Sequence, residues 1–293
     1  MVYYLLSGVV CDTTAQSKTF GRVLTISLTN VALSGTLPTL IGNLQAMSIM
    51  TLEGCQLSGI IPSTIGQLTS LRSLNIRNNL LRGSIPPSLG NLLPLVQLIL
   101  DSNELIGPIP DTIGALTKLQ FLQIGDNSLT GSIPSSISSM TSLTNIIISS
   151  CSLTGTLPSR LSALTSLVNL VLNDNSLSGS IPTSFGNMAS LVKLVLYSNK
   201  LIGPIPDNIG ALINLQSLQI GPNSLTGSIP SSISSMTRLA DIIIPSCSLT
   251  GTLPSSLSAL TKVNFIDLRN NYLTMGSSTS VLTSTFSTAT LKG

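Results

Sequence analysis

The sequence predicts an α/β-type repeat solenoid built around a long parallel β-sheet, and three observations predict it. Residues 23–262 divide into ten consecutive blocks of 24 residues without insertion, and a partial eleventh block follows. Position 13 of the block is glycine in all ten, from Gly35 to Gly251, and position 16 is proline in all ten, from Pro38 to Pro254. Positions 1, 4, 6, 11, 15, 19 and 22 are almost always Leu, Ile, Val or Met.

Each block predicts the same elements in the same order. Positions 3 to 7 alternate exposed and apolar residues, which predicts a short strand with one buried face. The glycine and the proline then bend the chain and exclude a helix at that point. The remaining apolar residues close the coil on its far side. Because one block cannot bury its apolar stripe alone, stacked blocks are expected to share a continuous core and to pair their strands in one sheet.

The block also resembles a known family. The pattern L-x-x-L-x-L-x-x-N-x-L is the leucine-rich repeat consensus, and its continuation L-x-G-x-I-P-x-x-I-G-x-L is similar to the plant-type subclass. That subclass includes ectodomains of receptor-like kinases, receptor-like proteins and polygalacturonase inhibitors. The resemblance covers residues 23–273 and implies a right-handed leucine-rich repeat superhelix with a concave strand face. It also implies a second short strand near the L-x-G-x-I-P turn. The motifs that carry the resemblance are highly specific for the fold and weakly specific for function.

The ends of the chain are expected to cap this stack. Residues 1–22 predict an N-terminal cap that is truncated or degenerate, because the segment beginning Gly8-Val-Val-Cys11 resembles the family's cap without its tryptophan and its second cysteine. Residues 263–293 predict a partial eleventh repeat followed by a Ser/Thr-rich C-terminal cap or tail. The apolar start of the chain is a poor match to a secretory signal peptide.

The composition excludes several classes of function. The chain is 42% hydrophobic and 8% charged, with a net charge of +3, so it has no basic tract for nucleic acid. No histidine is present, so a Ser–His or Cys–His pair and a His-ligated metal are excluded. The carboxylates are dispersed, and no apolar run is long enough to span a bilayer. We therefore expect no enzyme, no metal, no cofactor and no transmembrane segment in this chain.

Three of the four cysteines share one position of the repeat. Position 9 is cysteine in three blocks and asparagine in seven, and we expect these side chains to form an inward ladder that hydrogen-bonds the backbone beside each strand. Successive cysteines are four blocks apart, about 19 Å at the usual strand spacing, which is too far for a disulfide. The interpretation is buried thiols in place of amides. The ladder residues are Cys55, Asn79, Asn103, Asn127, Cys151, Asn175, Asn199, Asn223, Cys247 and Asn271.

The outward residues of the strands are the candidate binding surface. Ile99, Phe121, Ile147, Val171, Val195 and Tyr197 predict an exposed apolar band, which is typical of an interaction surface. Isolated β-branched residues that simply suit a strand are the alternative interpretation. Charged residues there are expected to be solvated or to face the partner. The candidate partner-binding residues are Ile99, Asp101, Phe121, Gln123, Asn145, Ile147, Val171, Lys193, Val195, Tyr197, Asp241 and Ile243.

An internal duplication supports this choice of surface. Residues 95–166 and 191–262 are identical at 57 of 72 positions, which indicates a duplicated unit of 96 residues. Eight of the 15 strand-face positions differ, against seven of 24 at other exposed positions. This mild excess of differences favours the strand face as the surface that contacts a ligand.

Three interpretations of function follow. The first is a non-enzymatic module, outside the cell or at its surface, that binds a protein, peptide or glycan through the strand face. The second is a structural or adhesive surface protein that self-associates, since low charge and a regular lattice favour assembly. The third is an ice-binding protein that uses ranks of Thr and Ser at positions 12 and 14, although Arg82, Ile106-Gly-Pro108 and Ile202-Gly-Pro204 interrupt these ranks.

Overall fold

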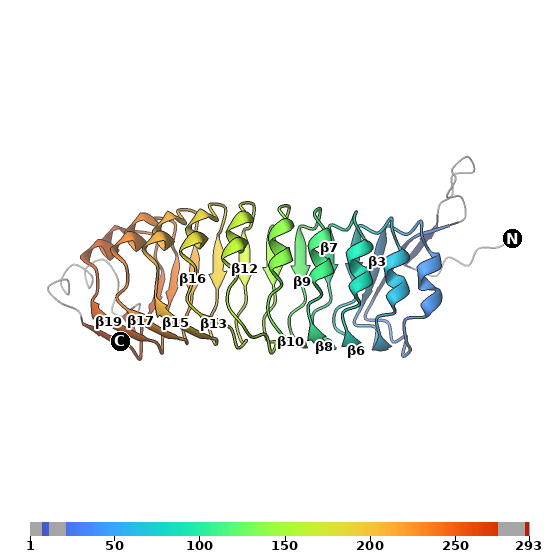
Figure 1. Cartoon of the computed structure of the whole chain (residues 1–293), viewed down its shortest axis with the longest axis horizontal. Helices are drawn as coiled ribbons and strands as arrows, with labels where there is room; N and C mark the ends of the chain where they lie inside the picture. Colours follow the sequence, from blue (N-terminus) through green and yellow to red (C-terminus); the bar gives the residue numbers. More distant parts are fainter. Residues whose placement is uncertain (1–7, 12–21, 275–290, 293) are drawn as a thin grey trace. The chain divides into compact units, whose positions relative to one another are not determined.

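A computed structural model describes residues 8–11, 22–274 and 291–292 of the chain (Figure 1). The chain divides into two compact units, Met1–Leu143 and Thr144–Gly293, and each is considered by itself. Much of both predicted caps lies outside the described residues. The described parts are β1 (Val9–Cys11), which pairs antiparallel with the first repeat strand, and β22 (Leu291–Lys292), which pairs parallel with the last.

The first unit contains two parallel arrays of short strands. After β1, the main sheet consists of β2 (Val23–Thr29), β3 (Ile49–Glu53), β5 (Ser73–Asn75), β7 (Gln97–Ile99) and β9 (Phe121–Gln123). The second sheet consists of β4 (Ser58–Ile60), β6 (Leu80–Ser84), β8 (Glu104–Pro108) and β10 (Ser128–Thr130). Both sheets repeat once per 24-residue block, so the predicted solenoid and its second strand near the glycine–proline turn are confirmed.

The second unit repeats the plan. Its main sheet consists of β11 (Asn145–Ile147), β12 (Asn169–Val171), β14 (Lys193–Val195), β16 (Ser217–Gln219), β18 (Asp241–Ile243), β20 (Phe265–Asp267) and β22. Its second sheet consists of β13 (Ser178–Gly179), β15 (Lys200–Pro204), β17 (Ser224–Gly227), β19 (Ser248–Thr252) and β21 (Tyr272–Thr274). The strands of each sheet pair in parallel, as repeated copies of one turn of a coil must.

Each repeat also contains a short 3-10 helix, which the sequence pattern alone did not predict. In the first unit these are η1 (Thr39–Asn43), η2 (Ser63–Gln67), η3 (Pro87–Asn91), η4 (Asp111–Ala115) and η5 (Ser135–Ser139). In the second they are η6 (Ser159–Ala163), η7 (Thr183–Asn187), η8 (Asp207–Ala211), η9 (Ser231–Ser235) and η10 (Ser255–Ala259). The position-16 proline is the N-cap; Pro110, for example, has φ −69° and ψ 138°. In each unit the 3-10 helices line one edge and the second sheet lies at the opposite edge (Figure 1).

The apolar positions of the repeat form the core. In the block at residues 71–94, the seven apolar positions are all between 0 and 1% exposed: Leu71, Leu74, Ile76, Leu81, Ile85, Leu89 and Leu92. Each such side chain contributes about 1.5–3 kcal/mol of hydrophobic stabilisation. Gly107 of the next block lies within the strand β8 and has φ +78°, a conformation that glycine adopts without strain, and this lets the chain bend inside the second strand. Residues 23–262 therefore fold by stacking rather than around one central core.

The position-9 side chains satisfy the backbone between repeats. The Asn79 amide oxygen accepts hydrogen bonds from the N–H groups of Cys55 and Leu57, both at 3.0 Å. Its Nδ2 donates to the carbonyl groups of Leu52 at 2.7 Å and Ile76 at 2.9 Å. The same pattern recurs at Asn103, Asn127, Asn175, Asn199, Asn223 and Asn271.

The cysteines reproduce part of this pattern with sulfur. Cys55 is buried, and its Sγ donates to the Leu28 carbonyl at 3.5 Å and the Glu53 carbonyl at 3.4 Å. Cys151 Sγ donates to the Ser149 carbonyl at 3.4 Å. Burial raises the pKa of Cys247, while hydrogen bonds from the backbone of Asn223 and Leu225 oppose that rise. These thiols therefore occupy the asparagine site as inward-facing groups that bond the backbone.

Candidate functional site

The strand face of the first unit forms three rows of outward side chains, which we call rows 3, 5 and 7 after their positions in the repeat. Gln97 lies opposite Phe121 and Ile99 opposite Gln123 in the parallel register of β7 and β9. Phe121 is 40% exposed, whereas Ile99 and Gln123 are half-buried. Among the candidate partner-binding residues of this unit, Phe121 is therefore the apolar side chain that is most exposed to solvent.

Row 7 of this unit is a line of charges. Arg77 Nη2 lies 2.6 Å from Glu53 Oε1, and Asn75 Nδ2 donates to Glu53 Oε2 at 3.2 Å. These contacts hold the pKa of Glu53 below its usual value, chiefly through the hydrogen bond from Arg77. Asp101 follows Arg77 in the row, and Gly125, which has no side chain, comes next.

Asp101 is not a solvated charge, which was one of the two expectations for the charged residues of the strand face. It is 8% exposed, and its Oδ1 atom is buried without a hydrogen-bond partner. Burial raises the pKa of Asp101, and the nearby Asp126 carboxylate raises it further, against the lowering effects of its own backbone N–H, Arg77 and Gln123. The expectation fails because side chains of neighbouring repeats, stacked about 4.8 Å apart, shield a short carboxylate.

The strand face of the second unit carries the other predicted residues. Row 3 runs Asn145, Asn169, Lys193, Ser217, Asp241 and Phe265, and row 5 runs Ile147, Val171, Val195, Gln219, Ile243 and Asp267. Lys193 is exposed, while Asn145, Asp241 and Ile243 are half-buried. Lys193 and Asp241 are separated in their row by Ser217, so the structure does not bring them together as an ion pair.

The apolar band of the second unit is less exposed than predicted. Val195 is buried, at 3% exposed, so the expectation that it lies open is wrong. Its short side chain stands in register between Val171 and Gln219, whose side chains cover it from both sides. Ile147, Val171 and Tyr197 are half-buried. Burial, and then the Asp174 carboxylate, raises the pKa of Tyr197.

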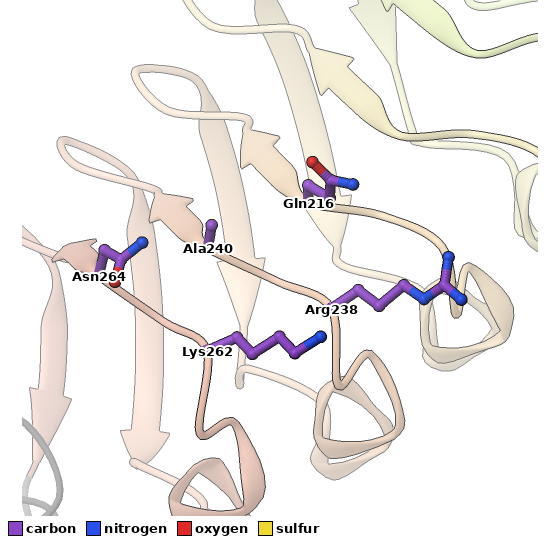
Figure 2. Close-up of a pocket in the computed structure, with 5 residues that line it drawn as sticks. All are labelled: Gln216, Arg238, Ala240, Lys262 and Asn264. Atoms are coloured by element: carbon purple, nitrogen blue, oxygen red, sulfur yellow. The ribbon is translucent and has the colours of Figure 1, made fainter.

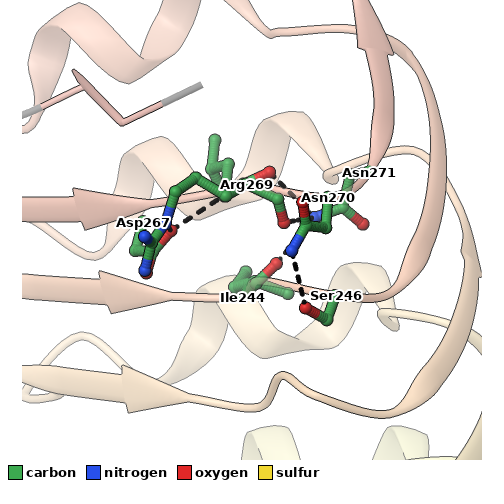
Figure 3. A network of polar contacts seen from close by, with 7 residues as sticks. Ile244, Ser246, Asp267, Arg269, Asn270 and Asn271 are labelled. Atoms are coloured by element: carbon green, nitrogen blue, oxygen red, sulfur yellow. Dashed lines mark hydrogen bonds and ion pairs between the residues drawn. The ribbon is translucent and has the colours of Figure 1, made fainter.

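The last repeat strand ends in an ion pair. Arg269 forms two hydrogen bonds with Asp267, from Nε to Oδ1 at 2.8 Å and from Nη2 to Oδ2 at 2.7 Å. Figure 3 shows this pair beside Asn270, whose Nδ2 donates to Ser246 Oγ at 3.2 Å. The ladder residue Asn271 bonds the Ile244 carbonyl at 2.8 Å in the same network. Asp267 is 4% exposed, so this part of row 5 is occupied by an internal contact rather than open to a ligand.

A hollow in the second unit was missed by the sequence analysis. It has a volume of about 550 Å³ and is lined by Gln216, Arg238, Ala240, Lys262 and Asn264. Figure 2 shows these residues on the segments that lead into the strands, at positions 2 and 24 of successive repeats. Two cations and no carboxylate line it, so it suits an anionic or hydrogen-bond-accepting group. The signal in the sequence was the basic residue at position 24 in two consecutive blocks.

The second sheet of the second unit presents small hydroxyl side chains to solvent. Six of them are exposed on β17, on β19 or, for Ser228, directly after β17: Ser224, Thr226, Ser228, Ser248, Thr250 and Thr252. The neighbouring strand β15 interrupts the array with Lys200, Ile202 and Pro204, and Ile202 is 54% exposed. The array is therefore regular over two adjacent strands of this sheet.

In the described part of the chain, no group of three or more His, Cys, Asp or Glu side chains is placed to hold a metal ion. None of the helices in the same residues combines the length and the apolar character needed to cross a bilayer.

Comparison with known proteins gives matches at the level of the repeat and the fold. The Leucine Rich Repeat family model matches residues 70–92, 118–140, 142–164, 166–188, 190–212 and 214–236. No curated protein sequence matches significantly.

Two receptor ectodomains are among the similar solved structures. The chain is 32% identical to the ectodomain of the Arabidopsis thaliana membrane receptor kinase GASSHO1/SCHENGEN3, solved with CASPARIAN STRIP INTEGRITY FACTOR 2, with a TM-score of 0.82 over 94% of this chain and 39% of that one. It is 37% identical to the plant peptide hormone receptor RGFR1, solved with RGF2, with a TM-score of 0.75 over 86% of this chain and 44% of that one. The chain thus spans about two fifths of the length of these receptor ectodomains.

A third similar structure is a plant ice-binding protein, 25% identical, with a TM-score of 0.70 over 91% of this chain and 77% of that one. The family model, the receptor likeness and the stacked 24-residue repeats agree with one another. The chain is a leucine-rich repeat protein of the plant type.

Proposed function

We propose that the chain is a non-enzymatic binding module that takes an extended peptide on its strand face, outside the cell or at its surface. The observation that carries this proposal is Phe121, an aromatic side chain that is 40% exposed on row 3 of the strand face, where Ile49 is exposed to the same extent. Exposed aromatic groups on a rigid scaffold are typical anchors of protein interfaces. The likeness to receptors solved in complex with CASPARIAN STRIP INTEGRITY FACTOR 2 and with RGF2 supports a ligand-binding module and this location.

A peptide is favoured over a folded protein or a glycan. The strand face offers parallel rows of side chains that cross successive repeats at a spacing of about 4.8 Å, so an extended peptide that lies along a row can contact several repeats in turn. Self-association through the same face is a separate outcome, which sedimentation over a concentration series would report.

The test is selection of binders from a phage-displayed library of random linear peptides on the immobilised chain. Selected peptides are expected to lose about tenfold or more in affinity for F121D, as expected when a charge replaces an aromatic anchor. The matched control is L93D, because Leu93 is 57% exposed in the same unit but lies off the strand face. Equal binding to wild type, F121D and L93D would place the ligand elsewhere and contradict the proposal.

A second candidate function, ice binding, rests on the exposed hydroxyl array of β17 and β19 and on the likeness to a plant ice-binding protein. The test is ice-recrystallisation inhibition and thermal hysteresis. Replacing Thr226 and Thr250 with lysine should abolish either effect if the second sheet binds ice, whereas F121D should leave it unchanged. A wild-type chain with neither effect removes this candidate.

A further inference from the structure

A buried carboxylate on the strand face of the first unit lacks one of its hydrogen bonds. Asp101 is 8% exposed, and its Oδ1 has no partner although the atom is shielded from solvent. Leaving a buried ionisable group unsatisfied is costly, and native proteins do so sparingly outside functional positions. The repeat lattice does not require an acid here, because the equivalent position of the preceding block is Arg77 and that of the following block is Gly125.

The surrounding charges leave this carboxylate without a cation of its own. The neighbouring guanidinium of Arg77 is held by Glu53 at 2.6 Å. Asp126, an exposed residue of the next repeat, acts on Asp101 as a second negative charge. Glu53 and Arg77 cancel each other, so two carboxylates remain in excess at this place.

Access to Asp101 requires a neighbouring side chain to move, because Asp101 and Gly125 are both buried. Gly125, the next residue of row 7, contributes no side chain, and its carbonyl accepts the backbone N–H of Ser102 beside Asp101 at 3.2 Å. Gln123, which hydrogen-bonds Asp101, is a half-buried and unbranched side chain. Rotamer changes of such side chains are common when interfaces form, so Gln123 can move aside.

The duplicated half of the chain offers an internal comparison. The residues equivalent to Asp101 and Asp126 are Tyr197 and Pro222, so both acids are replaced together. Gln123 and Gly125 do not change, since they correspond to Gln219 and Gly221, whereas Phe121 is replaced by Ser217. The acidic pair is therefore a property of one copy and is not needed to build the repeat.

We propose that Asp101 and Asp126 form a subsite that receives the cationic group of an arginine or lysine side chain of a bound peptide. This inference rests on the proposed peptide-binding function and names the chemistry of one ligand residue. The cation donates to Asp101 Oδ1 and lies between the two carboxylates, while the exposed ring of Phe121, two residues before Gln123 on the same strand, anchors an apolar residue elsewhere on the peptide.

A double-mutant cycle on a selected peptide tests the subsite. Peptides enriched on the wild-type chain are expected to share a basic position. Replacing that residue with glutamine should weaken binding to wild type by roughly tenfold or more, the range for hydrogen bonds to charged groups. The same replacement should have little effect on binding to D101N, and D126N should show a smaller loss of coupling because Asp126 is exposed. D111N is the matched control, since Asp111 is an exposed acid of the same unit that begins η4.

The outcomes separate this inference from the function on which it rests. Selected peptides without a shared basic residue, or with no coupling to Asp101, would overturn the subsite while F121D still abolished binding. A chain that selects no peptide, or whose peptides ignore F121D, would overturn the peptide-binding function and the subsite with it. If the basic peptide residue showed the same coupling energy with D111N as with D101N, the effect would be one of overall charge, and this too would overturn the subsite.

Discussion

Arg77 Nη2 lies 2.6 Å from Glu53 Oε1, and this ion pair joins the same position of two successive repeats. The guanidinium satisfies Glu53 on one side and leaves Asp101, on the other side, with an unpartnered oxygen. Row 7 thus contains a stabilising ion pair, Glu53–Arg77, and a destabilising buried carboxylate, Asp101. Their contributions to the free energy of unfolding change with pH in opposite directions.

Asp101→Asn is expected to stabilise the protein at neutral pH. Because the pKa of Asp101 is raised in the folded state, the native chain holds its proton more tightly, and the carboxyl costs stability as the pH rises above the unfolded value of about 3.9. Removing the charge should add about 1 kcal/mol or more to the free energy of unfolding at pH 7. The gain should vanish in acid, below about pH 4. Denaturant unfolding at both pH values checks this, and a D101N variant less stable than wild type at pH 7 would contradict it.

Glu53→Gln is expected to have the opposite sign and a smaller size. The pKa of Glu53 is lowered by Arg77, so its contribution is present above the unfolded pKa and is lost as the pH falls through the folded one. The pair is partly exposed, and salt screens it, so the loss at pH 7 should be at most about 1 kcal/mol. Thermal unfolding in low and high salt measures it. A loss that persists unchanged at high salt would show that packing, not charge, is responsible.

Asn79→Ala is expected to destabilise strongly. The substitution leaves the buried N–H groups of Cys55 and Leu57 and the carbonyl of Leu52 without their partner, at a cost of about 2–4 kcal/mol. Asn79→Cys should cost less, because a thiol already serves at the equivalent Cys55. The unfolding midpoints of the two variants, measured side by side, decide the point. Equal destabilisation by alanine and cysteine would mean that sulfur does not act in the ladder.

Much of the fold was predictable from the sequence because it follows from local repetition. The block at residues 71–94 contains its glycine, its proline and its seven apolar positions within 24 residues. The apolar side chains are buried in the structure, and the glycine and the proline lie where the chain bends. The 3-10 helices were not predicted, since the proline that seemed only to bend the chain also serves as their N-cap, as Pro110 does.

The binding surface was less predictable, because exposure depends on neighbouring repeats. Val195 has the alternation of an outward residue, yet Val171 and Gln219 stand beside it and bury it. The backbone conformation at position 8 of the repeat was not predicted either. Residues such as Asp126 and Asp174 adopt a positive φ there. The frequent Asn, Asp, Ser and Gly at this position could have indicated it. Burial and pairing of this kind are properties of the stack rather than of one block.

The most direct test of the central claim, that the strand face binds the ligand, is hydrogen–deuterium exchange with and without a selected peptide. Binding to the strand face should add protection in the segments that carry β7 and β9, with little change in β8 and β10 of the second sheet. Protection confined to β8 and β10, with β7 and β9 unchanged, would contradict it.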